Sequence, residues 1–269
     1  MSIFEYTFFQ NALLGSLLAS IVCGFVGTYI VSRRLVFISG GITHASFGGI
    51  GLGVYFGLNP IATAMAYAVL SAFGVQWMSR HVRVREDSAI ALFWTFGMSV
   101  GILCSFLTPG FMPDLPSFLF GSILTVGTSD LVLLAAVAVV VGVVFTVLYS
   151  TIVSIAFDPT FARSQRLPVD AVEYLMMALI AVTIVSTLRL VGIVLAISLL
   201  TVPQMTANLF TYDLRRIIAL SIVIGWVDCL VGLFISYWLN VPSGASIIFA
   251  GIVIYALLRA IKAVFFKFS

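Results

Sequence analysis

The chain consists of long apolar runs separated by short polar, charged or proline-containing segments. A helix needs about 20 apolar residues to cross the hydrocarbon core of a bilayer. This criterion predicts about nine spanning helices, with a range of eight to ten because Arg189 alone divides the sixth from the seventh. They lie near residues 9–32, 42–58, 60–79, 88–108, 128–153, 172–188, 190–210, 215–239 and 243–265, and the second is short. The pattern therefore predicts an all-α, polytopic membrane protein.

One segment contains an apolar run that is too short to cross a membrane. Residues 108–127 hold three prolines followed by a brief apolar stretch. Such a segment suits a short interfacial or re-entrant helix on the outer face. An ordinary extracytoplasmic loop fits the same residues, so the sequence leaves both interpretations open.

The composition agrees with a membrane protein. Of the 269 residues, 62% are hydrophobic and 9% are charged, and the mean hydropathy is +1.21. That leaves too little polar surface to cover a soluble globule. The stretches between predicted helices reach about twenty residues, far below a typical domain of about 100–150 residues. We expect one transmembrane domain over residues 1–269, with its first helix retained rather than cleaved as a signal peptide.

The basic residues test the topology independently. With the N-terminus outside, twelve of the thirteen Lys and Arg residues fall in cytoplasmic segments, and Arg189 alone falls outside. The twelve are Arg33, Arg34, Arg80, Arg83, Arg85, Arg163, Arg166, Arg215, Arg216, Arg259, Lys262 and Lys267. Because cytoplasmic loops are enriched in Lys and Arg, this distribution predicts an external N-terminus. An odd number of helices then predicts a cytoplasmic C-terminus.

His44 is one of two histidines, and it lies in a glycine-rich stretch at the predicted second helix. An ionisable side chain inside a membrane is costly unless it has a partner or a function. On a helix, the face of His44 also carries Gly40, Gly48, Gly51 and Tyr55. Small residues let another backbone approach or leave room for a path, so His44 should face protein or a channel rather than lipid. A metal or proton site and a histidine packed in a glycine-lined interface both fit.

Asp228 lies in the middle of a predicted span and also needs a partner or a hydrated cavity. A carboxylate near an imidazole forms a ligand pair for a divalent transition metal. Asp228 and His44 are therefore the candidate metal ligands. The alternative for Asp228 is a packing role, in which its carboxyl group contacts a neighbouring helix or forms a hydrogen bond with Trp226 or Ser236.

A short helix is predicted over residues 159–166, on the expected cytoplasmic face. Asp158 suits the N-cap position and Pro159 suits the first helical position. Pro168 disfavours a helical conformation at Leu167, so the helix should end before it.

The outward side chains of this predicted helix indicate a contact surface. We expect Phe161 to point toward a partner, and Arg163 and Arg166 to point toward solvent or acidic groups. Such a helix could receive force from a cytoplasmic motor. A capped surface linker fits the same residues.

Several chemical motifs are absent from the sequence. It contains no G-x-x-x-x-G-K-[ST] phosphate loop and no H-E-x-x-H zinc-protease motif. Cys23, Cys104 and Cys229 lie far apart and form neither a disulfide framework nor a paired zinc-ligand motif. We expect no catalytic activity, no intrinsic cofactor and no nucleic-acid partner. Nucleotide hydrolysis would require a separate chain.

Five short segments carry a resemblance to a known family. They are 43–46 (THAS), 114–115 with 119–121 (DL and LFG), 158–163 with 167–168 (DPTFAR and LP), 191–195 leading into 199–207 (VGIVL and LLTVPQMTA), and 242–245 (PSGA). Together, and over nearly the whole chain, they resemble the membrane-spanning permease subunits of metal-ion ABC importers. That family takes up zinc, manganese or iron(II).

The resemblance implies a permease subunit that moves a divalent transition metal into the cytoplasm by alternating access. In this family two permease subunits form the pathway, two cytoplasmic ABC ATPase subunits dock on short coupling helices, and an extracytoplasmic solute-binding protein delivers the metal. For this chain we expect a homodimer that crosses the lipid of a bacterial inner membrane several times. The coupling element would include Asp158, Pro159, Phe161, Ala162, Arg163 and Leu167, and His44 matches the family histidine on the metal path.

One position departs from the family pattern. The family commonly has an aspartate one helical turn before the histidine, and this chain has Gly40 there. Either Asp228 completes the site or His44 acts with its symmetry mate alone. Because imidazole suits zinc or iron(II) better than manganese, the sequence slightly favours those two metals. The main alternative function is a secondary, ion-coupled transporter in which His44 and Asp228 relay protons.

Overall fold

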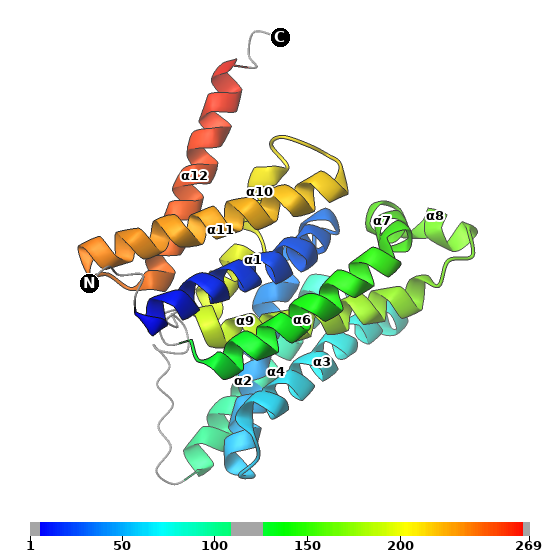
Figure 1. Ribbon diagram of the computed structural model, residues 1–269. Helices are drawn as coiled ribbons and strands as arrows, with labels where there is room; N and C mark the ends of the chain where they lie inside the picture. The colour runs from blue at the N-terminus through cyan, green and yellow to red at the C-terminus, as the bar shows by residue number, and fades with distance from the viewer. Residues whose placement is uncertain (1–5, 109–125, 266–269) are drawn as a thin grey trace. The chain divides into compact units, whose positions relative to one another are not determined.

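The computed structural model describes residues 6–108 and 126–265, without the side chains of residues 189, 190 and 265 (Figure 1). Every regular element in these ranges is helical, so the all-α prediction is confirmed for the described part of the chain. The proposed interfacial helix within residues 108–127 lies almost entirely outside the described residues.

The elements follow one another as a series of long helices with short connections. They are α1 (Thr7–Ser32), α2 (Val36–Tyr55), α3 (Pro60–Trp77), the π-helix η2 (Met78–Val82), α4 (Glu86–Leu107), α6 (Thr128–Val147), α7 (Tyr149–Phe157), α8 (Pro159–Ser164), α9 (Val169–Leu199), α10 (Val202–Ala207), α11 (Leu214–Leu239) and α12 (Ser243–Phe265). The α6 helix ends at Val147, so the predicted span over 128–153 is divided between α6 and α7.

Seven helical segments in the described residues are long and apolar enough to cross a membrane. They are Thr7–Ser32, Pro60–Val82, Glu86–Leu107, Thr128–Val147, Val169–Leu188, Leu214–Leu239 and Ser243–Val264. The other two predicted spans correspond to α2 and to the shorter apolar helix Val191–Ala207. The α2 helix has 20 residues, but its glycines, His44 and hydroxyl residues lower its hydropathy. The count of nine and the orientation of the termini stay predictions.

Gly192 explains why the sixth and seventh predicted helices were hard to separate. Its backbone has φ 76° and ψ 173°, which interrupts α9. This region is open to glycine and strained for other residues. The break therefore falls at Gly192, three residues after Arg189, where the sequence marked the boundary.

The described chain forms two compact units, each built from separated segments. The α1 unit comprises Met1–Arg34, Pro116–Tyr149 and Arg189–Ser269, and the α2 unit comprises Leu35–Leu115 and Ser150–Leu188, both with the gaps given above. A single transmembrane domain over the whole chain stays a prediction.

In the α1 unit, α1 packs against α6 on one side and α11 on the other (Figure 1). The α10 helix contacts α1, α11 and α12. Small residues allow these close contacts. A methyl group added at Gly27 would lie 2.6 Å from the Leu200 carbonyl oxygen, and one added at Gly225 would lie 3.4 Å from Pro203 Cγ. Gly27 therefore lets the backbone just before α10 approach α1, whereas the approach of α10 to α11 at Gly225 leaves room for ordinary van der Waals contact.

In the α2 unit, α2 packs against both α3 and α4. Its glycines bring the backbones together. A methyl group at Gly49 would lie 2.6 Å from Ala64 Cα in α3, and one at Gly51 would lie 2.7 Å from Gly101 Cα in α4. Real Cβ atoms essentially never lie this close to backbone atoms. The sequence of α2 therefore fixes both of its neighbours at backbone contact.

We expect Gly49→Ala to lower the free energy of unfolding by about 1–3 kcal/mol, because the added methyl group collides with the α3 backbone. Gly142→Ala in α6 is the matched control, since nothing lies within 4 Å of a methyl group there. That control should be neutral or up to about 1 kcal/mol more stable, as alanine favours helix. Thermal unfolding of the detergent-solubilised protein measures both, and equal melting temperatures would contradict the packing described.

Candidate functional site

His44 lies on α2 and stacks face to face on Trp94 of α4. The ring centroids are 4.5 Å apart and the ring planes differ by 3°. Next to this pair, a methyl group at Gly97 would lie 2.6 Å from Ala45 Cα, so the helices touch at the level of the stack. The prediction that the His44 face contacts protein agrees with this packing, because Gly48 and Gly51 on the same face adjoin α4.

The imidazole of His44 has an unused nitrogen. Its Nδ1 atom is buried and has no hydrogen-bond partner, while the residue as a whole is half-buried. A buried polar atom without a partner costs free energy unless something else binds it. In its neutral form, an imidazole can offer one nitrogen lone pair to a metal ion. The stack with Trp94 holds the plane of the ring in which this nitrogen lies.

Asp228 lies in α11 and is 2% exposed. Its Oδ1 atom has no hydrogen-bond partner. Gly251 of α12 makes room for the other oxygen, since a methyl group there would lie 3.0 Å from Asp228 Oδ2. A carboxyl group with an unpartnered oxygen in a buried site needs a proton or a cation.

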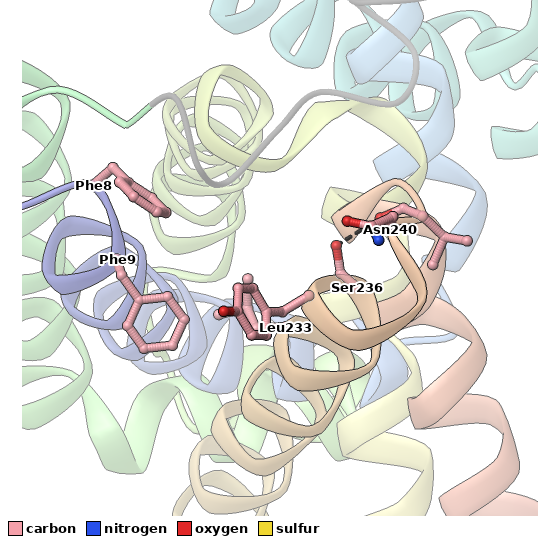
Figure 2. Close-up of a pocket in the computed structure, with 7 residues that line it drawn as sticks. Phe8, Phe9, Leu233, Ser236 and Asn240 are labelled. Atoms are coloured by element: carbon pink, nitrogen blue, oxygen red, sulfur yellow. Dashed lines mark hydrogen bonds between the residues drawn. The ribbon is translucent and has the colours of Figure 1, made fainter. Parts of the chain in front are cut away.

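The alternative hydrogen bond between Asp228 and Ser236 is not formed. The Ser236 hydroxyl instead donates to the carbonyl oxygen of Val241 at 2.6 Å (Figure 2). This bond lies beside a cavity of about 320 Å³ in the α1 unit, lined by Phe8, Phe9, Leu233, Ser236, Tyr237, Asn240 and Val241. The lining offers rings, aliphatic groups, hydroxyls and an amide rather than metal ligands.

Gln204 in α10 is a buried polar residue to which the sequence analysis gave no role. It is fully buried, its Nε2 atom donates to the carbonyl oxygens of Cys23 at 2.8 Å and Leu199 at 3.1 Å, and its Oε1 atom has no partner. The bond to Cys23 fixes α10 against α1. The signal in the sequence that could have indicated Gln204 is its position in segment 199–207, one of the five segments that carry the family resemblance.

The candidate ligands belong to different compact units, His44 to the α2 unit and Asp228 to the α1 unit. Within the described residues no group of three or more His, Cys, Asp or Glu side chains could hold a metal ion. The structure brings His44 together with Trp94, and Asp228 together with Gly251. A shared site of His44 and Asp228 stays a prediction.

The predicted helix at 159–166 is present as α8, over Pro159–Ser164. The Asp158 carboxylate caps it by accepting hydrogen bonds from the backbone N–H groups of Thr160 and Phe161, both at 2.9 Å. After α8 the chain turns through Arg166, which has φ 58°. The N–H of Leu167 then donates to the Ala162 carbonyl oxygen at 3.2 Å.

The side chains in and just after α8 are buried or exposed as the sequence predicts. Ala162 is fully buried and Phe161 is 56% exposed. The Arg163 guanidinium donates to Asp170 Oδ1 at 2.8 Å, and Arg166 is exposed. An exposed aromatic ring on a capped, anchored helix is a suitable contact for another protein.

Comparison with known proteins identifies the family. The ABC 3 transport family matches residues 5–262 of the chain. The chain belongs to this family. The resemblance drawn from the five short segments is therefore confirmed, and the chain is a membrane subunit of a transporter rather than an enzyme. Membership in the ABC 3 transport family does not favour the secondary-transporter alternative.

Individual relatives agree with the family match. An uncharacterised membrane protein of Synechocystis is 40% identical, over 96% of this chain and 92% of that protein. The manganese transport system membrane protein MntC of Halalkalibacterium halodurans is 31% identical, over 94% of this chain and 87% of that protein. The solved structure of PsaBC from Streptococcus pneumoniae in complex with Fab matches with a TM-score of 0.83 and 28% identity, over 94% of this chain and 91% of that chain.

Proposed function

We propose that this ABC 3 family member is the permease subunit of an ATP-driven importer that carries a divalent transition metal into the cytoplasm across a bacterial inner membrane. The observation that carries the proposal is the His44 imidazole, with its buried, unpartnered Nδ1 atom stacked in place on Trp94. Imidazole is a preferred ligand of such metals. The name of the MntC relative, a manganese transport system protein, supports a metal cargo.

Asp228 is the second proposed ligand. Its buried carboxyl group has an unpartnered oxygen, as expected for a group that binds a cation during transport. It would supply the acidic ligand that Gly40 cannot supply.

The narrower proposal concerns the identity of the metal. An imidazole with at most one carboxylate suits zinc or iron(II), whereas a site for manganese is richer in oxygen ligands. The MntC name favours manganese, but that relative is 31% identical to this chain and its ligands need not be the same. We therefore keep zinc or iron(II) as the proposed cargo, with manganese as the competing outcome.

The proposed partners follow from the family and from α8. Two copies of this chain would form the pathway, one ABC ATPase subunit would dock on α8 of each copy, and a solute-binding protein would deliver the metal from outside. The exposed Phe161 ring and the Asp158 cap support the docking role of α8.

His44→Ala should lower metal uptake at least about tenfold, since even changes around a metal ligand cost about 10–100-fold. Uptake of zinc, iron(II) and manganese is measured in proteoliposomes that contain the complete complex. His81→Ala is the matched control, because His81 also stacks on a tryptophan, Trp77, but is exposed. Normal uptake by His44→Ala would remove the proposed site, and uptake without ATP or ATPase subunits would support a secondary transporter.

Asp228→Asn keeps the side-chain volume and removes the negative charge. If the carboxylate binds the metal, uptake should fall at least about tenfold while the melting temperature changes little. The control is Ser221→Ala in the same helix, where a buried hydroxyl also has no partner. A changed melting temperature with unchanged uptake would show that Asp228 is a packing residue.

Phe161→Ala should weaken binding of the ATPase subunit about tenfold or more, because exposed aromatic residues at the centre of an interface contribute most of its binding energy. Copurification and binding titrations of the detergent-solubilised complex measure this. Phe37→Ala, which removes another exposed ring, should leave binding unchanged. Equal affinities of the two variants would argue against α8 as the docking site.

A further inference from the structure

A continuous set of ion pairs and hydrogen bonds joins α8 to the end of α3 within the α2 unit. Arg163 of α8 pairs with Asp170 at 2.8 Å, and Asp170 also pairs with Arg80 of η2. Arg80 pairs in addition with Glu173. Gln76 in the last turn of α3 donates from Nε2 to Glu173 Oε2 at 2.8 Å. We call these five residues the Arg80 bridge.

The Arg80 bridge runs from the surface into the interior. The Asp170 side chain is 65% exposed, whereas the Glu173 side chain is 6% exposed. Exposed ion pairs are weak, while a buried carboxylate held by a guanidinium and an amide has little freedom. The end at α3 is therefore rigid, and the exposed Asp170 is the weaker link that joins it to α8.

The rigid end of the bridge leads to the helix that carries His44. The α3 helix continues directly into η2, so Gln76 and Arg80 lie on one helical segment. The other end of that segment contacts α2 at backbone distance. A methyl group at Gly53 would lie 2.8 Å from Pro60 Cα, in addition to the contact at Gly49. Packed interiors transmit displacement rather than absorb it.

We propose that the Arg80 bridge transmits movement of α8 to α3, and through α3 to α2 and His44. Arg80, Asp170 and Glu173 are positioning residues in this scheme. They neither bind the metal nor contact the ATPase. The inference rests on the proposed function, since it requires a partner that moves α8. Its content is the assignment of Arg80, Asp170 and Glu173 as the residues that carry this coupling in the α2 unit.

Asp170→Asn tests the bridge where it joins α8. The side chain is exposed, and Glu173 remains paired with Arg80 and Gln76, so the variant should fold normally. We expect the amount of metal transported per ATP hydrolysed to fall about two- to fivefold, because the exposed Asp170 carboxylate loses its ion pairs with Arg163 and Arg80. The affinity for the ATPase subunit should stay unchanged. Asp170→Glu keeps the carboxylate and should restore the ratio.

Asp87→Asn is the matched control. Asp87 is 53% exposed by its side chain, lies in the first turn of α4 and pairs with Arg85, two residues before it. It is therefore an acidic residue of similar exposure in the same compact unit, and its ion pair stays local. Its loss should leave the ratio of metal to ATP at the wild-type value.

Two results would overturn the proposal. One is an equal ratio of metal to ATP in Asp170→Asn and Asp87→Asn, and the other is a loss of ATPase binding in Asp170→Asn, which would make Asp170 a docking contact. Failure of the proposed docking of the ATPase on α8 is recognised separately, because Phe161→Ala would then leave ATPase binding unchanged. If Phe161→Ala weakens binding and Asp170→Asn leaves the ratio intact, only the inference about the bridge fails.

Discussion

The close approach of helix backbones at glycine is the constraint on which the α2 unit depends. Inside a bilayer, burying apolar side chains does not drive helices together, because lipid is equally apolar. Association relies on close packing, and α2 achieves it with glycines that meet α3 at Ala64 and α4 at Gly101. These glycines also place His44 against Trp94, so the feature that holds the unit together also positions its ionisable side chain.

In the α2 unit, ion pairs and hydroxyl hydrogen bonds lie in different places. Three of the ion pairs gather where η2, α8 and the start of α9 meet, at the Arg80 bridge, and the Arg85–Asp87 pair lies at the start of α4. Along α2 itself, hydroxyl groups donate to the carbonyl oxygens of their own helix, as Thr43 and Ser46 do. Those residues satisfy their own polar groups, whereas the Nδ1 atom of His44 stays unpartnered. This contrast is what separates His44 from the structural polar residues around it.

Local signals made much of this structure predictable. Apolar runs located the long helices, and Asp158 with Pro159 located α8, because capping depends on neighbours in the sequence. Pairings between distant residues were not accessible. Nothing near Arg80 in the sequence indicates Glu173, and nothing near His44 indicates Trp94, although Trp94, Gly97 and Gly101 do share a helical face. The break in α9 was placed at Arg189 because charge is visible in a sequence, while the backbone conformation of Gly192 is not.

The absence of a carboxylate at Gly40 can be understood from what a transport site must do. A site on a path has to bind its ion well enough to admit it and weakly enough to release it. A carboxylate at position 40 would place both ligands on α2, one helical turn apart. In the proposed site, a single imidazole beside the Trp94 ring would leave the remaining ligands to other helices. If one of those ligands is Asp228, as proposed, the acidic ligand comes from α11 rather than from α2.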